Sequence, residues 1–505
     1  MPAQKRLVLA TIDQDERPVS IRTLGAYAET LGVEVALLVL LKPLARIGRP
    51  VEFSDPEIRQ IASFLESRKA THLGFYLMTA SLKPYALLAK ALRAAGFRGV
   101  ILAGGVHPTL CPEESLVEGA DFAVQGPGEL PLKLLLEGAE SASIPGLVWR
   151  REGAIAVNPV TDAQKMDLDA LPFPIFRFDK DRVLVDGRLR RLSWRLHRKH
   201  ATWGGRYYDV VTSRGCIYRC AYCCNLYGSP VRRQTVDRVM SELKSVRARE
   251  PRVAGLNFHD DSFFAGSDEW LEAFCARMKA EVGLPFIVRM IPRYVTPERI
   301  RKLKDAGMEY VTMGLEGSDR INKTLYNRSE TAESYIEAAK VILGEGVYLS
   351  TDIIIHNPYE REEDLREMAE TLNELPRPNW GVVSLSLTPF PNTPLYRRCV
   401  KERSLDRFAT DAYDSMLMPS REEGYRTPRF WLLLNTQVLP RISMEQGRRL
   451  IRAGPGDRRA IQSVERVASA IQRTKAITTW MQSRTPRLYS FLEGVSRLLT
   501  RRVRR

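Results

Sequence analysis

The stretch that decides the fold is SRGCIYRCAYCC, residues 213–224, in which three cysteines stand in a CxxxCxxC spacing. Cys216, Cys220 and Cys223 follow directly after DVVTS, an apolar run that we predict to be a strand. The three thiolates would surround a strand-to-helix loop. Three protein ligands leave one iron of a [4Fe-4S] cluster without a protein donor, so that iron is open to a substrate or cofactor. We therefore predict that these cysteines bind an iron–sulfur cluster.

A structural zinc site is the alternative interpretation of the same cysteines. It needs a fourth Cys or His at a matching spacing. Cys224 is directly adjacent to Cys223 and geometrically awkward, while Cys111, Cys275 and Cys399 stand alone. Seven cysteines in 505 residues are also too few and too unevenly placed for a disulfide scaffold. We therefore expect reduced thiols and a cluster rather than zinc or disulfides.

The region around and after the cysteines alternates strands with helices. Its six predicted strands are DVVTS, GLNFHD, FIVRMI, YVTMGLE, YLSTDIIIH and VVSLSLTPF, with helices between them such as residues 236–249 and 331–345. Six βα units fit a partial barrel better than another open sheet, and the chemistry of such barrels sits at the carboxyl ends of the strands. We predict a partial (β/α)6 barrel over residues 208–400.

The first 140 residues show a second α/β pattern. About five short apolar runs alternate with helices of 8 to 15 residues, which predicts a doubly wound, Rossmann-like parallel sheet covered on both faces. Ligands of such sheets bind outside the carboxyl ends of the strands. The Gly104-Gly105 and Gly126-Pro127-Gly128 turns fall at those ends. We place this domain at residues 1–140.

The remaining segments are a connection and a basic end. We predict a β-hairpin at residues 144–160 and assign residues 141–207 to a hairpin and a basic linker, which includes RLRRLSWRLHRKH at 188–200. Residues 401–505 read as a helical, basic C-terminal region. The net charge is +16, and residues 425–505 hold 18 basic and four acidic residues. Charge gathered in one tail argues against a nucleic-acid-binding protein, whose basic residues line the functional face.

The last helix of the C-terminal region is predicted to be amphipathic and basic. It would either pack on its own protein or make peripheral contact with an anionic membrane. Its apolar residues recur at helical spacing opposite four arginines: Leu488, Phe491, Leu492, Val495, Leu498 and Leu499. No apolar run reaches the roughly 18 residues that span a bilayer, and the N-terminus is no signal peptide. We expect a cytoplasmic protein.

The cysteine motif resembles that of the radical S-adenosylmethionine superfamily, with Tyr222 as the aromatic residue before the third cysteine. The resemblance implies that the open iron binds S-adenosylmethionine, whose reductive cleavage gives a radical that removes hydrogen from an unactivated carbon. It also implies cofactor contacts at Asp260 and Asp261 after the second strand, where the family's Gly-Gly-Glu is replaced by His259-Asp260-Asp261.

Two further landmarks of that family follow along the chain. GLEGSD resembles the motif that contacts the cofactor ribose, which implies that role for Glu316 and Ser318. IIIHNPYE resembles the turn after strand five, so His356 and Asn357 would face the substrate. For the aspartates a helix N-cap is the alternative, and for Glu316 a salt bridge at the rim.

The N-terminal domain resembles the cobalamin-binding domain of the cobalamin-dependent radical S-adenosylmethionine enzymes. The matching stretches are GFYLMTASL, ILAGGVHPT and DFAVQGPGELPLKLLL. By this resemblance the cofactor-binding residues are Thr79, Gly104, Gly105, Gly126, Gly128 and Glu129. Residues 13–18 hold no axial histidine of the DxHxxG type, and His107 reads as a turn residue rather than a cobalt ligand.

The resemblance implies an enzyme with three cofactors: a [4Fe-4S] cluster, S-adenosylmethionine and cobalamin. The reaction we expect is methyl transfer to an unactivated carbon of a small molecule or lipid, with a flavodoxin or ferredoxin as one-electron donor. The alternatives are a ring-forming oxidative cyclase of the same family and, more remotely, an RNA-modifying methylthiotransferase. Substrate-contacting catalytic residues are not identified by the sequence.

Overall fold

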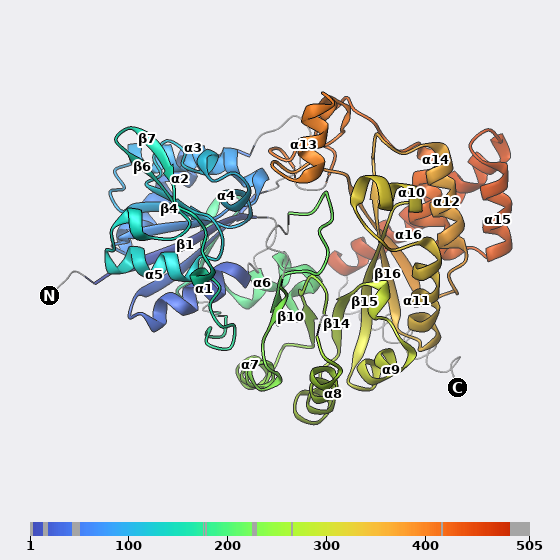
Figure 1. Ribbon diagram of the computed structural model, residues 1–505, viewed down its shortest axis with the longest axis horizontal. Coiled ribbons are helices and arrows are strands. Elements are labelled where there is room, and N and C mark those ends of the chain that lie inside the picture. Colours follow the sequence, from blue (N-terminus) through green and yellow to red (C-terminus); the bar gives the residue numbers. More distant parts are fainter. Residues whose placement is uncertain are drawn as a thin grey trace.

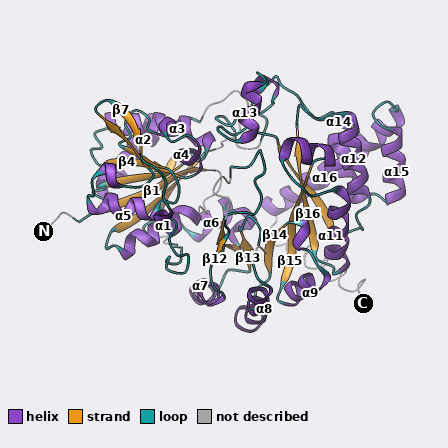
Figure 2. Ribbon diagram, in the orientation of Figure 1, coloured by secondary structure: helices purple, strands orange, loops and turns teal. Residues whose placement is uncertain are grey.

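The computed structural model places two α/β domains side by side, followed by a helical C-terminal region (Figure 1). The structure describes residues 4–13, 19–42, 51–174, 176, 179–224, 230–263, 266–415 and 418–484. Within these ranges helices flank the strands of both domains (Figure 2). The fold class predicted from the sequence is confirmed.

The N-terminal domain is built on five parallel strands in the order β5-β4-β3-β1-β2. They are β1 (Arg6–Asp13), β2 (Glu34–Leu41), β3 (His72–Tyr76), β4 (Val100–Gly104) and β5 (Phe122–Val124). The six central residues of β1 are all buried, because helices cover both faces of the sheet. One face packs against α1 (Val19–Thr30) and α5 (Glu129–Glu137), and the other against α2 (Asp55–Ser67) and α3 (Leu82–Ala94).

The sheet extends beyond residue 140, which differs from the predicted domain boundary. The predicted hairpin forms as β6 (Leu147–Arg151) and β7 (Ala154–Val157), but it pairs with β5 and so belongs to the first sheet. At the opposite edge β8 (Arg182–Val185) pairs with β2, and β9 (Arg188–Arg191) pairs with β8. The basic stretch is therefore an edge strand followed by α6 (Trp194–His200), not a linker.

A buried ion pair explains why this returning segment stays on the first domain. Arg22 of α1 lies 3.2 Å from Asp181, just before β8, and the two side chains are 0% and 2% exposed. Hydrophobic periodicity does not report such pairings, because an edge strand that alternates apolar and basic residues looks like a linker. Between β4 and β5 the connection is short: α4 (Val106–Leu110) is followed by a 3-10 turn over Glu113–Ser115.

The second domain is a six-stranded parallel partial barrel, as predicted. Its strands, in spatial as well as chain order, are β10 (Tyr207–Val210), β13 (Gly255–Phe258), β14 (Phe286–Met290), β15 (Met308–Glu316), β16 (Tyr348–Ile355) and β17 (Trp380–Ser386). The helices between them are α7 (Val236–Arg249), α8 (Asp268–Arg277), α9 (Pro297–Asp305), α11 (Ala332–Gly344) and α12 (Glu362–Asn373). Thr235, Ser267, Thr296 and Thr331 start α7, α8, α9 and α11 by accepting a hydrogen bond from a first-turn amide.

The C-terminal region packs onto the barrel. After α13 (Pro394–Lys401) the chain forms α14 (Arg429–Leu433), α15 (Met444–Ala453) and α16 (Arg458–Arg484). Trp431, Leu434 and Val464 are buried in the same core as the barrel strands. The helix predicted around residues 488–499 lies outside the described residues, so membrane contact stays a prediction.

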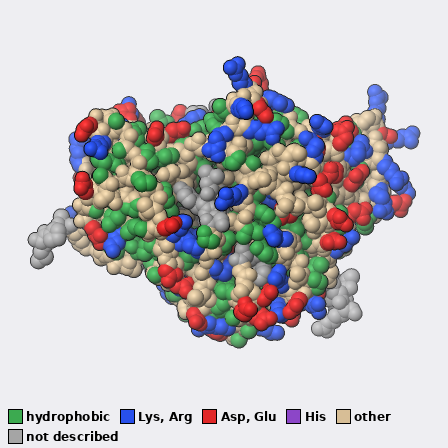
Figure 3. Space-filling model, in the orientation of Figure 1, with side chains coloured by type: hydrophobic (Ala, Val, Ile, Leu, Met, Phe, Trp, Pro, Cys, Tyr) green, Lys and Arg blue, Asp and Glu red, His purple; other side chains and the backbone are tan. Residues whose placement is uncertain are grey.

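Charged side chains are interspersed on the molecular surface. On the face shown in Figure 3, Lys and Arg alternate with Asp and Glu over both domains. Among the described residues no helix is both long enough and apolar enough to cross a membrane.

Replacing Trp431 by Ala tests whether the C-terminal region is part of the barrel core. Its side chain is 1% exposed, so Trp431→Ala should cost about 3–5 kcal/mol of stability and lower the midpoint of thermal unfolding. Leu87→Ala is the control, because Leu87 is 54% exposed and its loss should cost below about 0.5 kcal/mol. Equal midpoints for the two variants would show that the region is not integral to the fold.

Candidate active site

The cysteine loop begins where β10 ends, and Asp260 holds it in place. The Asp260 carboxylate accepts hydrogen bonds from the amides of Thr212 and Ser213, at 2.7 and 3.0 Å, and from the Thr212 hydroxyl. Arg233 lies 3.4 Å away. Asp260 is 1% exposed and positions the loop. Its contact to S-adenosylmethionine stays a prediction. Asp261, in contrast, is exposed and close enough to Cys216 to influence its pKa.

The three cysteines of the motif are half-buried on one loop. Burial, together with Asp261 and Cys220, raises the pKa of the Cys216 thiol to about 11, so a thiolate there calls for a metal cation. Among the described residues, the three sulfur atoms do not all lie within 4.8 Å of one another. A single tetrahedral zinc ion would hold its sulfurs about 3.8 Å apart. At least one pair of these sulfurs is therefore too far apart for one zinc ion, and binding of an iron–sulfur cluster stays a prediction.

Arg328 is the site residue that the sequence analysis missed. Its guanidinium lies 3.7 Å from the Cys220 sulfur, 3.5 Å from the Tyr222 hydroxyl and 3.8 Å from a Glu316 oxygen. It also donates to the Gly314 carbonyl, at 3.3 Å. Arg328 therefore connects the cysteine loop to the carboxyl end of β15. No motif marks it, because it lies in an irregular turn, and only the fold brings it to the cluster loop.

Glu316 lies where the resemblance implied, at the carboxyl end of β15. Its backbone is left-handed, with φ of 65°, and the side chain folds back over Gly314, where a Cβ would collide with the carboxylate. Burial raises the pKa of Glu316, while Arg328 and the Tyr222 hydroxyl oppose the shift. The carboxylate and Arg328 together offer an acceptor and a cation beside the cysteine loop.

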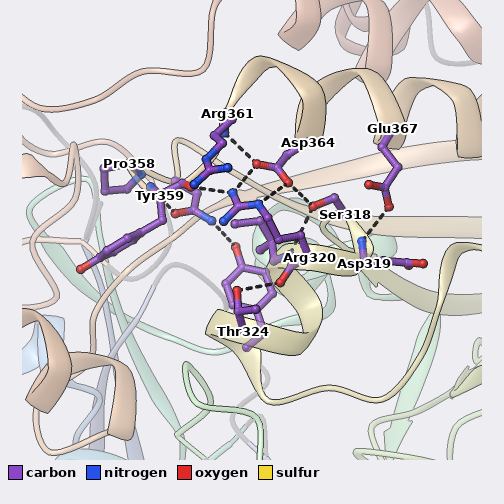
Figure 4. A network of polar contacts seen from close by, with 12 residues as sticks. Ser318, Asp319, Arg320, Thr324, Pro358, Tyr359, Arg361, Asp364 and Glu367 are labelled. Atoms are coloured by element: carbon purple, nitrogen blue, oxygen red, sulfur yellow. Dashed lines mark hydrogen bonds and ion pairs between the residues drawn. The ribbon is translucent and has the colours of Figure 1, made fainter.

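Ser318 is occupied by contacts within the protein (Figure 4). Its hydroxyl donates to Asp364 at 2.6 Å and caps the short helix α10 (Asp319–Ile321) by accepting from the Ile321 amide. Asp364 also accepts from Arg320 at 2.9 Å and from the Arg361 amide at 2.8 Å. This network fixes the turn after β15. The ribose contact of Ser318 stays a prediction, since a serine after a strand also serves as a helix cap.

His356 and Asn357 are also buried in contacts with the protein. The His356 amide donates to the Thr427 hydroxyl at 2.7 Å, and the Thr427 amide donates to His356 Nδ1 at 3.0 Å. Asn357 donates to the Tyr326 hydroxyl at 3.0 Å and is 0% exposed. Both residues hold the turn after β16, and their contact with a substrate stays a prediction.

A cavity of about 280 Å³ opens at the carboxyl ends of the N-terminal strands, between the two domains. Its lining includes four of the predicted glycines and one carboxylate: Gly104, Gly105, Gly126, Gly128 and Glu129. A Cβ on Gly104 would meet nothing within 4 Å, so the backbone there faces open space. Gly105 has φ of 109° and lies against Tyr76, so it serves the turn itself. A backbone-lined hollow of this kind accommodates a bulky planar ligand and its tail.

Thr79 and His107 lie away from that lining. Thr79 is 0% exposed and its hydroxyl lies 3.3 Å from His107 Nδ1, a contact within the domain. The cofactor contact of Thr79 stays a prediction. His107 belongs to α4 and is 0% exposed. Its ring lies near Cys111 and Glu114, whose donor atoms are within 4.8 Å of it and of each other.

Glu129 connects the cavity to the cysteine loop. Arg214, two residues before Cys216, donates to the Glu129 carboxylate at 2.6 Å, and Arg214 also lines the cavity. Glu129 is 4% exposed and begins α5. The two predicted cofactor sites are therefore adjacent across one ion pair.

Comparisons with known proteins agree with this arrangement. Residues 5–136 match the B12 binding domain family, and residues 210–372 match the Radical SAM superfamily. An uncharacterized methyltransferase of Pyrococcus horikoshii is 24% identical over 72% of this chain and 76% of its own. Cytidylyl-2-hydroxyethylphosphonate methyltransferase of Streptomyces wedmorensis is 22% identical over 60% of this chain and 61% of its own.

A solved structure shares the fold. It is the radical S-adenosylmethionine methyltransferase TsrM of Kitasatospora setae, with cobalamin and a [4Fe-4S] cluster bound. The TM-score is 0.64 at 19% identity, covering 79% of this chain and 78% of TsrM.

Iron content tests the cysteine assignment. Replacing Cys216, Cys220 or Cys223 singly by Ala should remove most of the iron and sulfide after anaerobic reconstitution, because each thiolate holds one iron. Cys275→Ala is the control, since Cys275 lies on α8 and is buried in the barrel core, in a cluster without residues of the cysteine loop. Full iron in all three variants would refute the assignment.

A substitution at Gly104 tests whether the cavity binds the corrinoid. Gly104→Val should block uptake of hydroxocobalamin while leaving iron unchanged, because the new side chain meets open space rather than protein. Gly344→Val is a matched control, since a Cβ there also meets nothing within 4 Å and Gly344 does not line the cavity. The measurement is corrinoid absorbance after desalting. Retention of corrinoid by Gly104→Val would place it elsewhere.

Proposed function

This chain is a cobalamin-dependent radical S-adenosylmethionine enzyme, and we propose that it transfers a methyl group to an unactivated carbon of a small organic molecule. The observation that carries the proposal is the Arg214–Glu129 contact of 2.6 Å, which brings the glycine-lined cavity next to the cysteine loop. Methyl transfer to a carbon radical requires a methyl donor and a radical source that reach the same substrate atom, and two adjacent cofactor sites meet this requirement.

Each cofactor has a set of residues that would hold it. Cys216, Cys220 and Cys223 would bind the cluster, while Glu316 and Arg328 would contact S-adenosylmethionine beside it. The cavity at Gly104 and Gly128 would take the corrinoid. When bound, these groups supply a carbon radical and a methyl group. The chain itself supplies the geometry, because the cysteine loop and the β15 end are joined through Arg328.

Two other reactions remain to be compared with methyl transfer. An oxidative cyclase uses the same cofactors but closes a ring. The methyltransferase names of two relatives favour methyl transfer. An RNA-modifying methylthiotransferase would need further cluster cysteines, whereas Cys111, Cys275 and Cys399 are buried in different parts of the described chain.

The reaction needs partners that we infer from its chemistry. The substrate is a small molecule or lipid that enters between the domains. A one-electron donor such as flavodoxin or ferredoxin reduces the cluster.

Labelled S-adenosylmethionine tests the proposed reaction. The holoenzyme is incubated anaerobically with reductant, methyl-labelled S-adenosylmethionine and a metabolite extract from a strain that lacks the gene. We expect a product that is heavier by one labelled CH₂ unit, together with 5'-deoxyadenosine and S-adenosylhomocysteine. A gene-dependent product without label, formed with loss of two hydrogens, would instead establish the cyclase.

A further inference from the structure

The side chains that face the barrel lumen can be identified from strand alternation. On β16, Leu349 and Ile353 pack in the core beneath the outer helices, and the Thr351 hydroxyl meets Tyr335 of α11. Because successive side chains of a strand point to opposite faces, Ser350 and Asp352 face the lumen. The same rule places Arg289 of β14 and Gly314 of β15 on the lumen side.

Most charged groups of the lumen have partners. His259 Nε2 lies 2.8 Å from an Asp209 oxygen, and Asn257 donates to the same oxygen at 3.0 Å. Arg289 lies 3.3 Å from His259 Nδ1 and from the Phe258 carbonyl. Glu316 faces Arg328.

Asp352 is different from these groups. Within the described chain, no donor lies at hydrogen-bonding distance from its carboxylate and no Lys or Arg nitrogen lies within 4 Å. Asp352 pairs in register with Gly314, the residue over which the Glu316 carboxylate folds. Two carboxylates therefore lie close together at one level of the lumen. Burial, and then Glu316, raise the pKa of Asp352 to about 7, although Arg289 opposes the shift.

The neighbouring strand adds an apolar surface. Asp352 also pairs in register with Val383 of β17, so the two side chains lie on the same face of the sheet. Val383 is 44% exposed even though its strand is part of the barrel. Val383 therefore presents an exposed apolar surface beside the carboxylate.

We propose that the lumen binds a substrate that carries a protonated amine next to an apolar group, with Asp352 as the counter-ion of the amine and Val383 against the apolar part. A half-buried carboxylate without a partner is costly, and a cation that enters the lumen removes that cost. The amine would lie between Asp352 and the Glu316 side of the barrel, and Arg289 on β14 would disfavour a second cation. The inference rests on the proposed function, because it describes the substrate of the same barrel.

S-Adenosylmethionine is also a cation, and the test must separate the two ligands. Arg328 and Glu316 are next to the cysteine loop, whereas Asp352 lies on the neighbouring strand β16, opposite Gly314. Asp352→Asn should therefore leave the affinity for S-adenosylmethionine, and its cleavage without substrate, within about twofold of the parent protein.

The experiment compares three probes that share one apolar body: 2-phenylethylamine, 2-phenylethanol and 3-phenylpropanoate. Their affinities are measured by calorimetry at pH 8, where Asp352 is mostly ionised, on anaerobic holoenzyme with S-adenosylmethionine and no reductant. The amine should bind at least about tenfold more tightly than the alcohol, as expected of a charge-assisted hydrogen bond, and the carboxylate should bind weakest. Asp352→Asn should abolish the preference for the amine.

Two controls make the result specific. Asp305→Asn changes the net charge equally on the exposed end of α9 and should keep the preference. Ser350→Ala alters the same face of β16 and should keep the preference as well.

Equal affinities for the three probes, no measurable binding of the amine, or a preference that survives in Asp352→Asn would overturn the proposal. Loss of affinity for S-adenosylmethionine in Asp352→Asn would assign the residue to that cofactor and overturn it too. Failure of the parent protein to bind corrinoid or cleave S-adenosylmethionine would instead refute the proposed function, and the amine preference can be measured independently of it.

Discussion

The contact between Arg214 and Glu129 is the interaction on which the arrangement of this protein depends. In both domains ligands are expected at the carboxyl ends of parallel strands, so the two domains must turn those ends toward each other to share a substrate. Arg214 stands at the start of the cysteine loop and Glu129 at the start of α5, so a 2.6 Å contact between them sets the distance between the two sites. Glu129 is almost fully buried, and loss of Arg214 would remove the cation that contacts its carboxylate directly.

The sequence predicted the parts of the fold that depend on local pattern. All six barrel strands and the five parallel strands of the first sheet appear where apolar runs predicted them, because buried parallel strands are apolar on both faces. Strands β8 and β9 were missed, since their attachment depends on a contact from Asp181 to Arg22 more than 150 residues earlier. The same limit applies to Arg328 and Asp352, whose roles depend on spatial neighbours rather than on spacing.

The polar residues next to strand ends show a second limit of sequence reasoning. Glu316, Ser318, Asp260 and His356 all follow strands, where a side chain can contact a ligand or shape the turn. In the structure Ser318 caps a helix, and Asp260 accepts hydrogen bonds from two amides of the cysteine loop. His356 is hydrogen-bonded to Thr427. Glu316 and His356 both have a left-handed backbone, with φ of 65° and 58°, but of the four only Glu316 has a glycine beneath its carboxylate. Backbone strain persists where the surrounding structure holds it, and side-chain contacts separate the two residues: His356 is hydrogen-bonded to Thr427, whereas Glu316 faces Arg328 beside the cysteine loop.

The C-terminal region contains none of the cofactor motifs, yet it contributes to the site through the barrel. Burial lowers the pKa of His356 to about 4, so the imidazole is neutral at pH 7 and its Nδ1 can accept from the Thr427 amide. That bond ties the turn after β16 to the segment leading into α14, and Trp431 then anchors α14 in the barrel core. Asp352 lies on the same strand, four residues before His356. A half-buried carboxylate without a partner destabilises the strand that carries it and favours local rearrangement. The hydrogen bonds between His356 and Thr427 and the apolar core around Trp431 stabilise that strand, and so keep Asp352 facing the lumen.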